Sequence, residues 1–317
     1  MIVVLGDLLM DYSMRLHDMQ MRPEDLHQVT FLELGPGGAT NVAIMAARLG
    51  LKVSCVGEVG DDLFGRILRD SLLTEHIDTT SIRVTPGART PVANVIVDES
   101  GEPAYLGYPG SLQLRKLLDS WRALIEEAEA LFSDGWAEYD GVPGIILEAF
   151  HLARKAGVPT FFDAGPGNPC VDNNWHREAS AISTVFLGTD REAARVTGQS
   201  DPLIAARSLL DKGVKLVILK RGVAGCLLVD ETGLEIAPGY PVEARDATGA
   251  GDSFAGAVIY GYLHGLSLPS LGTLANATGA AKVQKLGTGH NMPWPAEIRE
   301  VLARYGEDDL DFGLPSV

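Results

Sequence analysis

The sequence has few cysteines and no long hydrophobic run. Its three cysteines, Cys55, Cys170 and Cys226, are widely spaced and form no Cys-x-x-Cys pair, so they indicate neither a disulfide framework nor a cysteine-based metal site. We therefore expect reduced thiols and a cytoplasmic protein. No segment reaches the roughly 18 apolar residues of a membrane helix. The apolar start, Met1–Leu5, is too short for the hydrophobic part of a signal peptide.

Basic side chains are also scarce, because 26 Lys and Arg face 42 Asp and Glu, which gives a net charge of −16. An acidic protein is repelled by the phosphates of nucleic acids and by anionic lipids. We therefore expect no nucleic-acid partner and no membrane partner. The hydrophobic share of 46% is typical of a soluble globular chain. At about 150 residues per domain, the length suits two domains or one large α/β domain.

Hydrophobic patterning indicates an α/β fold. Short apolar runs such as Ile2–Leu5 and Thr160–Asp163 alternate with longer amphipathic segments such as Thr40–Leu49. This alternation predicts a mostly parallel sheet with helices on both faces. Residues 10–34 and 90–108 break the pattern, and the second stretch is typical of a β-hairpin. We expect these two stretches to form a small β-rich appendage on the α/β body.

The first of three glycine-rich segments is Gly35-Pro-Gly-Gly-Ala-Thr-Asn41, which opens a predicted helix. Glycines at a helix start allow backbone N–H groups to approach an anion. Thr40 stands where the third glycine of a G-x-G-x-x-G motif would be, which disfavours a dinucleotide-dependent dehydrogenase. Taken alone, the segment is also compatible with a simple tight turn into a helix.

The second segment, Asp246-Ala-Thr-Gly-Ala-Gly-Asp252, precedes another predicted helix. Its small residues leave backbone N–H groups free to hold an anion at the helix N-terminus. Asp252 either caps the helix or accepts a proton from a hydroxyl group. The pairing of a carboxylate with an anion-binding turn favours the second role. The third segment, Leu286–Asn291, by itself indicates only the end of a helix.

Together these segments resemble the motifs of the ribokinase-like (PfkB) carbohydrate kinases. Gly37–Ala43 and Ala46–Gly50 resemble the first family motif, and Asp246–Phe254 resembles the second. Similar landmarks occur at Gly57–Gly65 and Leu219–Gly225, so the resemblance extends over nearly the whole chain. It implies a three-layer ribokinase-like fold, with a mostly parallel central sheet, helices on both faces and a small β-sheet lid.

The resemblance also implies a division of the chain and an activity. The α/β body would comprise residues 1–9, 35–89 and 109–317, and the discontinuous lid residues 10–34 and 90–108. The implied reaction transfers the γ-phosphoryl group of ATP to a hydroxyl of a small sugar, with Mg²⁺ and, in some members, K⁺.

By position, the resemblance assigns Asp252 as general base and Gly249, Ala250 and Gly251 as the anion hole. The implied sugar contacts are Asp7, Leu9, Asp11, Gly37, Gly38 and Asn41. The implied ATP contacts are Thr189, Lys220, Gly222, Gly225 and Asn276. Glu192 would hold Mg²⁺ through water, and a monovalent cation would be bound by Asp246, Thr248, Gly287 and Asn291, mostly through backbone carbonyl oxygens. The family's Asn-x-x-Glu reads Thr189-Asp-Arg-Glu192 here, and an ordinary first-turn carboxylate is the alternative role for Glu192.

The identity of the acceptor stays open. A nucleoside kinase or sugar-phosphate kinase of the same family is one alternative, and a non-catalytic sugar- or nucleotide-binding protein is another. A phosphosugar would need clustered basic residues, and Arg15, Arg89 and Arg115 are scattered in the sequence. Asp134 is a further candidate acceptor contact. We also expect the apolar strand Val92–Val97 to expose a face that pairs with a second lid in a homodimer.

Overall fold

The computed structural model describes residues 1–17, 19–20, 22–112, 114–136, 141–167, 174–307 and 309–315, and Cys170 lies outside them. In this part of the chain, nine strands form a large sheet in the order β13-β12-β11-β10-β9-β8-β1-β4-β5. Its strands are β1 (Ile2–Leu5), β4 (Val53–Gly60), β5 (Ile82–Thr85), β8 (Ala130–Asp134), β9 (Thr160–Asp163), β10 (Val185–Thr189), β11 (Leu216–Lys220), β12 (Cys226–Asp230) and β13 (Leu234–Ala237). From β5 to β11 all neighbours are parallel, whereas β12 and β13 join antiparallel.

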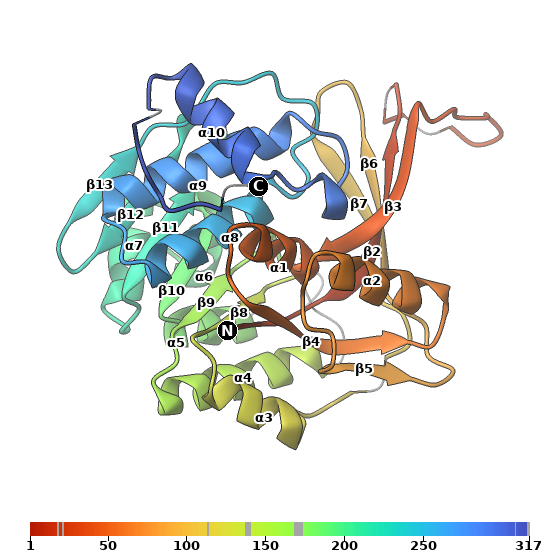
Figure 1. Cartoon of the computed structure of the whole chain (residues 1–317), viewed down its shortest axis with the longest axis horizontal. Coiled ribbons are helices and arrows are strands. Elements are labelled where there is room, and N and C mark those ends of the chain that lie inside the picture. Colours follow the sequence, from red (N-terminus) through yellow and green to blue (C-terminus); the bar gives the residue numbers. More distant parts are fainter. Residues whose placement is uncertain are drawn as a thin grey trace.

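Helices cover both faces of this sheet (Figure 1). They are α1 (Ala39–Arg48), α2 (Leu63–Thr74), α3 (Asp119–Glu126), α4 (Val142–Ala156), α5 (Asn174–Ile182), α6 (Asp190–Thr197), α7 (Pro202–Leu210), α8 (Ala250–Leu263), α9 (Leu268–Val283) and α10 (Pro295–Arg304), with short 3₁₀ turns η1 (Gly222–Ala224) and η2 (Gly289–Asn291). Side chains alternate along β1, so Ile2 and Val4 pack in a core with α1, α8 and α9, while Val3 and Leu5 pack in a second core with α3 and α4. The predicted three-layer α/β fold is confirmed.

The ends of several helices follow from local sequence. The Asp62 side chain accepts a hydrogen bond from Gly65 N and so caps α2. Asp201 does the same for α7, accepting from Leu203 N and Ile204 N. Helix α4 ends at Gly157, whose φ of 78° is left-handed and favours glycine. These residues set where the elements begin and end.

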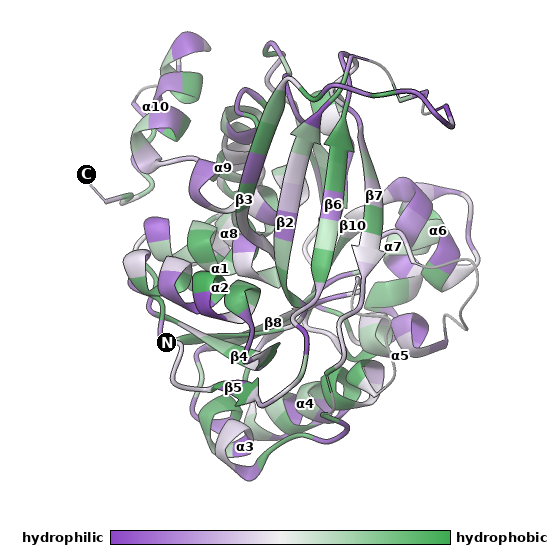
Figure 2. Cartoon of the chain, turned by 90° about the vertical axis from the view of Figure 1, so that its right-hand side faces the viewer, coloured by the Kyte–Doolittle hydropathy of each residue, from purple (hydrophilic) through white to green (hydrophobic). Residues whose placement is uncertain are grey.

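A second sheet, in the order β3-β2-β6-β7, stands at one side of the body and faces the viewer in Figure 2. Strands β6 (Val92–Val97) and β7 (Pro103–Tyr108) form the predicted hairpin. Strands β2 (Leu8–Arg15) and β3 (Phe31–Gly38) pair antiparallel and extend beyond the expected stretch 10–34 at both ends. The glycines that end β3 therefore belong to the small sheet and lead directly into α1.

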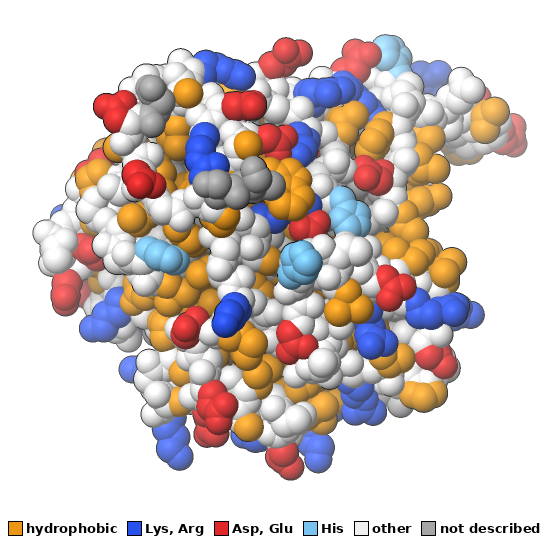
Figure 3. Space-filling view, viewed as in Figure 1, with side chains coloured by type: hydrophobic (Ala, Val, Ile, Leu, Met, Phe, Trp, Pro, Cys, Tyr) orange, Lys and Arg blue, Asp and Glu red, His pale blue; other side chains and the backbone are white. Residues whose placement is uncertain are grey.

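The expectation of an exposed apolar face on β6 is wrong for half of the strand. Strand β6 is interior, flanked by β2 and β7, and Val95, Ile96 and Val97 are buried. Large apolar side chains are exposed instead on the other strands of the small sheet, at Tyr12 of β2, Leu32 of β3 and Leu106 of β7. Figure 3 shows hydrophobic side chains along the edge of the molecule where the small sheet stands. Pairing through this sheet in a homodimer stays a prediction.

On the face drawn in Figure 3, Lys and Arg side chains lie scattered among acidic ones. Of the helices in the described part of the chain, none is both long enough and apolar enough to span a membrane.

Candidate functional site

The carboxyl ends of the parallel strands meet at one edge of the large sheet and place polar side chains there. Asp134, Asp163, Thr189 and Lys220 are the last residues of β8, β9, β10 and β11, and Asp7 follows β1 by two positions. In open α/β sheets, ligands bind at this edge. The strand order therefore brings together residues that lie far apart in the sequence.

A cleft of about 700 Å³ opens between this edge, the small sheet and the start of α8. The predicted site residues that line it are Asp7, Leu9, Asp11, Gly38, Asn41, Glu192, Lys220, Thr248, Gly249, Gly251 and Asp252. The small sheet contributes residues including Val92, Tyr105 and Tyr108. The predicted residues that do not line it are Gly37, Thr189, Gly222, Gly225, Asp246, Ala250, Asn276, Gly287 and Asn291. The base, the two anion-hole glycines and all predicted acceptor contacts except Gly37 thus share one cleft, whereas Lys220 is the one expected ATP contact that lines it.

Asp252 lies in the first turn of α8, directly after the glycine turn. Gly249 precedes the helix with a φ of 74°, and a β-carbon there would lie 2.6 Å from Met292 Cε, so the turn requires glycine. Asn41 on α1 donates from Nδ2 to Asp252 Oδ2 at 2.8 Å, and Gly289 N donates to Asn41 Oδ1 at 3.0 Å. These two bonds fix the orientation of the Asn41 amide and, through it, one carboxylate oxygen of Asp252.

The three glycine-rich segments therefore converge. Gly38 has a φ of 58°, and a β-carbon there would lie 2.5 Å from the Asp7 carbonyl oxygen, so β3 can meet β2 closely only with glycine at this position. Thr288 Oγ1, from the third segment, donates to Asp11 Oδ2 at 2.6 Å. The third segment, which the sequence indicated only as a helix end, thus holds two of the residues that face the cleft.

Of the residues expected to bind a monovalent cation, Asp246 and Asn291 have side-chain hydrogen bonds to neighbouring segments, and the buried hydroxyl of Thr248 has no hydrogen-bond partner among the described residues. Asp246 accepts from Thr248 N at Oδ1 and from Gly287 N at Oδ2, each at 2.8 Å. Asn291 Nδ2 donates to Glu33 Oε2 at 2.6 Å. Asp246 thereby ties the loop before α8 to the loop after α9.

The residues expected to contact ATP have distinct local partners. Lys220 Nζ lies 2.5 Å from Asp163 Oδ2, and both residues line the cleft. Asn276 Nδ2 donates to the carbonyl oxygens of Ala237 and Pro238, at 3.1 and 2.9 Å, outside the cleft lining.

Thr189 and Glu192 form a capping box at the start of α6. Glu192 N donates to Thr189 Oγ1 at 3.2 Å, and Thr189 N donates to Glu192 Oε2 at 2.7 Å. The alternative of a first-turn carboxylate is thus observed for Glu192, although its side chain also lines the cleft. The threonine that replaces the family's asparagine has a structural role as the helix cap.

Burial dominates the electrostatics of the cleft. Desolvation raises the pKa of Asp252, and the Asp163 carboxylate adds to the rise. The Asn41 hydrogen bond and the ammonium groups of Lys220 and Lys282 oppose it, and the resulting pKa is about 6. Burial likewise raises the pKa of Asp11 and of Asp134 to about 7. Asp252 is therefore a carboxylate that can exchange a proton near neutral pH.

Sequence reasoning missed several residues at this site. Asp163 ends a strand that was predicted, and its strand-end position was the available signal. Tyr105 of the small sheet and Trp136 of the body line the cleft with ring centroids 5.3 Å apart in an edge-on pair. Lys282, which is fully buried near the glycine turn, gave no signal, because a lysine near a helix end is ordinarily solvent-exposed.

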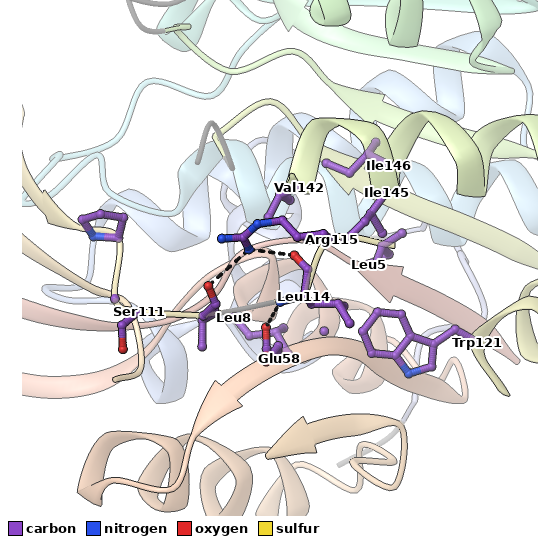
Figure 4. Close-up of a pocket in the computed structure, with 15 residues that line it drawn as sticks. Leu5, Leu8, Glu58, Ser111, Leu114, Arg115, Trp121, Val142, Ile145 and Ile146 are labelled. Carbon is purple, nitrogen blue, oxygen red and sulfur yellow. Dashed lines mark hydrogen bonds between the residues drawn. The ribbon is translucent and has the colours of Figure 1, made fainter. Parts of the chain in front are cut away.

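A second cavity of about 410 Å³ lies beside the cleft (Figure 4). Its walls are mainly apolar and include Leu8, Trp121 and Ile145. Its Glu58 carboxylate accepts from Leu114 N at 2.8 Å, and Arg115 Nη1 donates to Leu114 O at 2.9 Å. These polar groups bond to the adjacent loop, so the larger cleft, where the carboxylates converge, is the candidate active site.

Comparisons with known proteins agree with this geometry. Residues 1–295 match the family described as pfkB family carbohydrate kinase. The chain is 30% identical to ribokinase from Mus musculus over 309 residues, which cover 94% of this chain and 93% of that protein. It is 26% identical to a nucleoside kinase from Methanothermobacter thermautotrophicus over 306 residues, 96% of each chain.

The fold is shared with a solved structure as well. Arabidopsis thaliana ribokinase, complexed with ribose and ATP, superposes with a TM-score of 0.81 at 22% identity and covers 95% of this chain and 98% of that one. Since the family match takes in both sheets and every segment of the cleft, this chain belongs to the pfkB family of carbohydrate kinases and is a carbohydrate kinase.

Proposed function

We propose that this enzyme transfers the γ-phosphoryl group of ATP to a hydroxyl of a small neutral sugar, with Asp252 as general base. The observation that carries the proposal is the position of Asp252. It directly follows the Gly249–Gly251 turn at the N-terminus of α8, faces the cleft and is held by Asn41 at 2.8 Å. A proton acceptor beside a positively polarised helix end suits a reaction in which a hydroxyl loses a proton while a phosphoryl group carries charge.

Different residues of the chain bind the acceptor, take up its proton, stabilise the phosphoryl charge and exclude water. Asp7 and Asp11 line the cleft on the side of the small sheet and present carboxylates to acceptor hydroxyls. Asp252 takes the proton of the attacking hydroxyl. The backbone N–H groups of Gly249 and Gly251, which line the cleft, stabilise the negative charge that develops on the phosphoryl oxygens, whereas the Ala250 N–H donates to the Ala247 carbonyl oxygen. Tyr105 and the rest of the small sheet shield the acceptor from water, which limits hydrolysis of ATP.

ATP and Mg²⁺ fit the residues present. Lys220 and the glycine turn offer positive charge and N–H donors to phosphates, and Glu192 offers a carboxylate at the cleft wall. Among the described residues, no group of three or more His, Cys, Asp and Glu side chains could hold a metal by itself. Mg²⁺ is commonly held by one or two carboxylates, water and substrate phosphates, so Glu192 would suffice. When bound, the ion would neutralise charge on the transferred phosphate.

The charge of the cleft favours an uncharged acceptor over a sugar phosphate. Lys220 is the single Lys or Arg among the described residues that line it. Asp163 already compensates this ammonium at 2.5 Å, and Asp7 and Asp11 lie on the acceptor side. A phosphate on the acceptor would find carboxyl groups there instead of basic side chains, whereas sugar hydroxyls can hydrogen-bond to carboxyl groups.

One observation supports a nucleoside as the second candidate. The Tyr105–Trp136 pair places two aromatic rings on the cleft wall, and a nucleobase stacks favourably on such rings. A nucleoside kinase is also among the similar proteins. The non-catalytic alternative loses its basis, because the chain retains the proposed base and belongs to a kinase family.

The test is a coupled assay of ADP release with D-ribose, D-fructose, inosine and ribose 1-phosphate, each compared with an acceptor-free blank. We expect one neutral sugar or nucleoside to raise ADP release at least about tenfold above the blank, and ribose 1-phosphate to give little. ADP release that is equal with and without every acceptor would contradict the proposal. A preference for ribose 1-phosphate would contradict the neutral acceptor but not the transfer of a phosphoryl group.

The raised pKa of Asp252 predicts the pH dependence. A base must be deprotonated to act, and burial raises the pKa of this carboxyl to about 6. We therefore expect kcat at saturating substrates to fall as the pH is lowered from 7 to 5 and to be level above 7. Measurement of initial rates across this range, with the coupling enzymes in excess, checks it. An unchanged rate at pH 5 would exclude Asp252 as the titrating base.

A further inference from the structure

A fully buried lysine lies behind the anion-hole turn. Lys282 is in the last turn of α9 and is 0% exposed. A β-carbon placed on Gly249 would lie 3.4 Å from Lys282 Cε, so the stem of this side chain packs against the turn on the side away from the cleft. Its ammonium donates to the carbonyl oxygen of Lys285 at 3.4 Å. Lysine side chains are almost never fully buried unless their charge is paired.

The surroundings of this ammonium are acidic. Burial lowers the pKa of Lys282 to about 8, while Asp246, Asp252 and Asp11 each favour its charged form and Lys285 opposes it. The C-terminal end of α9, where Lys282 lies, adds the partial negative charge of the helix dipole. The side chain is thus placed where a positive charge is stabilised by carboxylates and carbonyl groups.

The glycine turn has a cation on each side. A β-carbon on Gly251 would lie 3.3 Å from Lys220 Nζ, at the cleft face. Lys220 is compensated by Asp163 at 2.5 Å, and it faces the ligand. Lys282 instead faces the back of the turn and the loop from Lys285 to Asn291. It therefore acts on the turn itself rather than on a bound nucleotide.

Two of the residues expected to hold a monovalent cation have side-chain hydrogen bonds in this region, whereas the buried hydroxyl of Thr248 has none within the described part of the chain. Both carboxylate oxygens of Asp246 accept backbone N–H groups, and the Asn291 amide nitrogen is bound to Glu33. The fit of a K⁺ ion is poor, because the Lys282 ammonium, 3.4 Å from the Lys285 carbonyl oxygen, already brings a positive charge to the start of the loop that contains Gly287 and Asn291. A K⁺ ion beside Lys282 would add a second positive charge at close range in a buried site.

We propose that Lys282 is a built-in cation of the anion hole, which supplies behind the Gly249–Gly251 turn the positive charge that a bound monovalent ion would otherwise supply. The catalytic part of this inference rests on the proposed phosphoryl transfer. The structural part, which is that the folded protein needs no bound K⁺, does not rest on that reaction. Lys282 is a positioning residue, since it acts through the turn and not on the substrate.

The first test uses the unmodified enzyme. Its thermal unfolding midpoint and its initial rate are measured in KCl, NaCl and choline chloride at equal ionic strength. We expect the three midpoints to agree within about 1 °C, and the three rates to be nearly equal, because no ion site is left to fill. A specific rise of the midpoint, or severalfold activation, in KCl alone would overturn the proposal. The midpoint requires no turnover, so this result stands apart from the fate of the proposed reaction.

The second test compares two substitutions at one position. Lys282→Met keeps the length of the side chain and removes the charge, so we expect kcat to fall about tenfold or more, with no recovery in KCl. Lys282→Ala also leaves space, so KCl should raise its unfolding midpoint by about 2–4 °C over choline chloride and restore part of its activity. A Lys282→Met enzyme with unaltered kcat would overturn the proposal. If Lys282→Ala fails to fold, the Met variant and the first test still decide.

Discussion

Asp252→Asn is expected to lower kcat by about 10² to 10⁴ while leaving the affinity for ATP nearly unchanged. The asparagine has the same shape, and its carbonyl oxygen can still accept the bond from Asn41 Nδ2, which is 2.8 Å long in the parent enzyme. What is lost is the ability to take a proton from the acceptor hydroxyl. Turnover in the coupled ADP assay and binding of a non-hydrolysable ATP analogue by calorimetry measure the two quantities separately.

The same variant is expected to be at least as stable as the parent. Burial raises the pKa of Asp252 from 3.8 to about 6, so the folded state holds this proton more tightly than the unfolded state. Its contribution to the free energy of unfolding is therefore present below pH 4 and is lost as the pH rises through 6. At pH 8 the parent enzyme keeps a buried, ionised carboxylate, which lowers its free energy of unfolding. The neutral asparagine removes this destabilisation, so the unfolding midpoint should stay level or rise. If the loss of activity came from unfolding of the variant, its unfolding midpoint would be lower than that of the parent.

Asp70→Asn is the matched control for Asp252→Asn. Asp70 is an exposed aspartate on α2, so the change removes the same charge away from the cleft. We expect its kcat to be close to that of the parent. A near-normal kcat for Asp252→Asn, or an equal loss in Asp70→Asn, would remove Asp252 from the mechanism.

Much of the fold could be predicted because it depends on local pattern. The alternation of apolar runs with amphipathic segments gave the order of strands and helices, and the α/β body with its small sheet is observed. The position of Asp252 beside a glycine turn could also be predicted, since both lie within one segment. Such features require no knowledge of contacts between distant parts of the chain.

What could not be predicted depends on pairing across the chain. Strand β6 has an apolar sequence that suits an exposed or a buried strand, and only its neighbours β2 and β7 make it interior. Lys220 meets Asp163 because β9, β10 and β11 are adjacent in the sheet. Likewise Asn41 and Gly289 are 248 positions apart. In each case the tertiary structure decides the role of the side chain.

Arg48 illustrates how such a distant contact supports the active site. It is 6% exposed at the end of α1, and its guanidinium donates to both carboxylate oxygens of Glu75, at 2.9 and 2.5 Å. It also donates to the carbonyl oxygens of Met292 and His290 and lies 3.9 Å from the ring centre of Trp294. Arg48 therefore holds the loop whose Gly289 N fixes Asn41 and, through it, Asp252.

Arg48→Met is expected to lower the free energy of unfolding by about 3–5 kcal/mol, because it leaves the buried Glu75 carboxylate with only the His290 imidazole, at 3.2 Å, as a partner. It should also reduce kcat, since small displacements of a positioned base are costly. Urea unfolding measures the first effect, with Arg154→Met, an exposed arginine of α4, as a control expected to change little. The double variant Arg48→Met with Glu75→Met removes the stranded charge and should recover part of the stability, but not the kcat, because the loop carbonyls still lack their donor. Equal urea midpoints for Arg48→Met and the parent would show that the loop is held by other contacts.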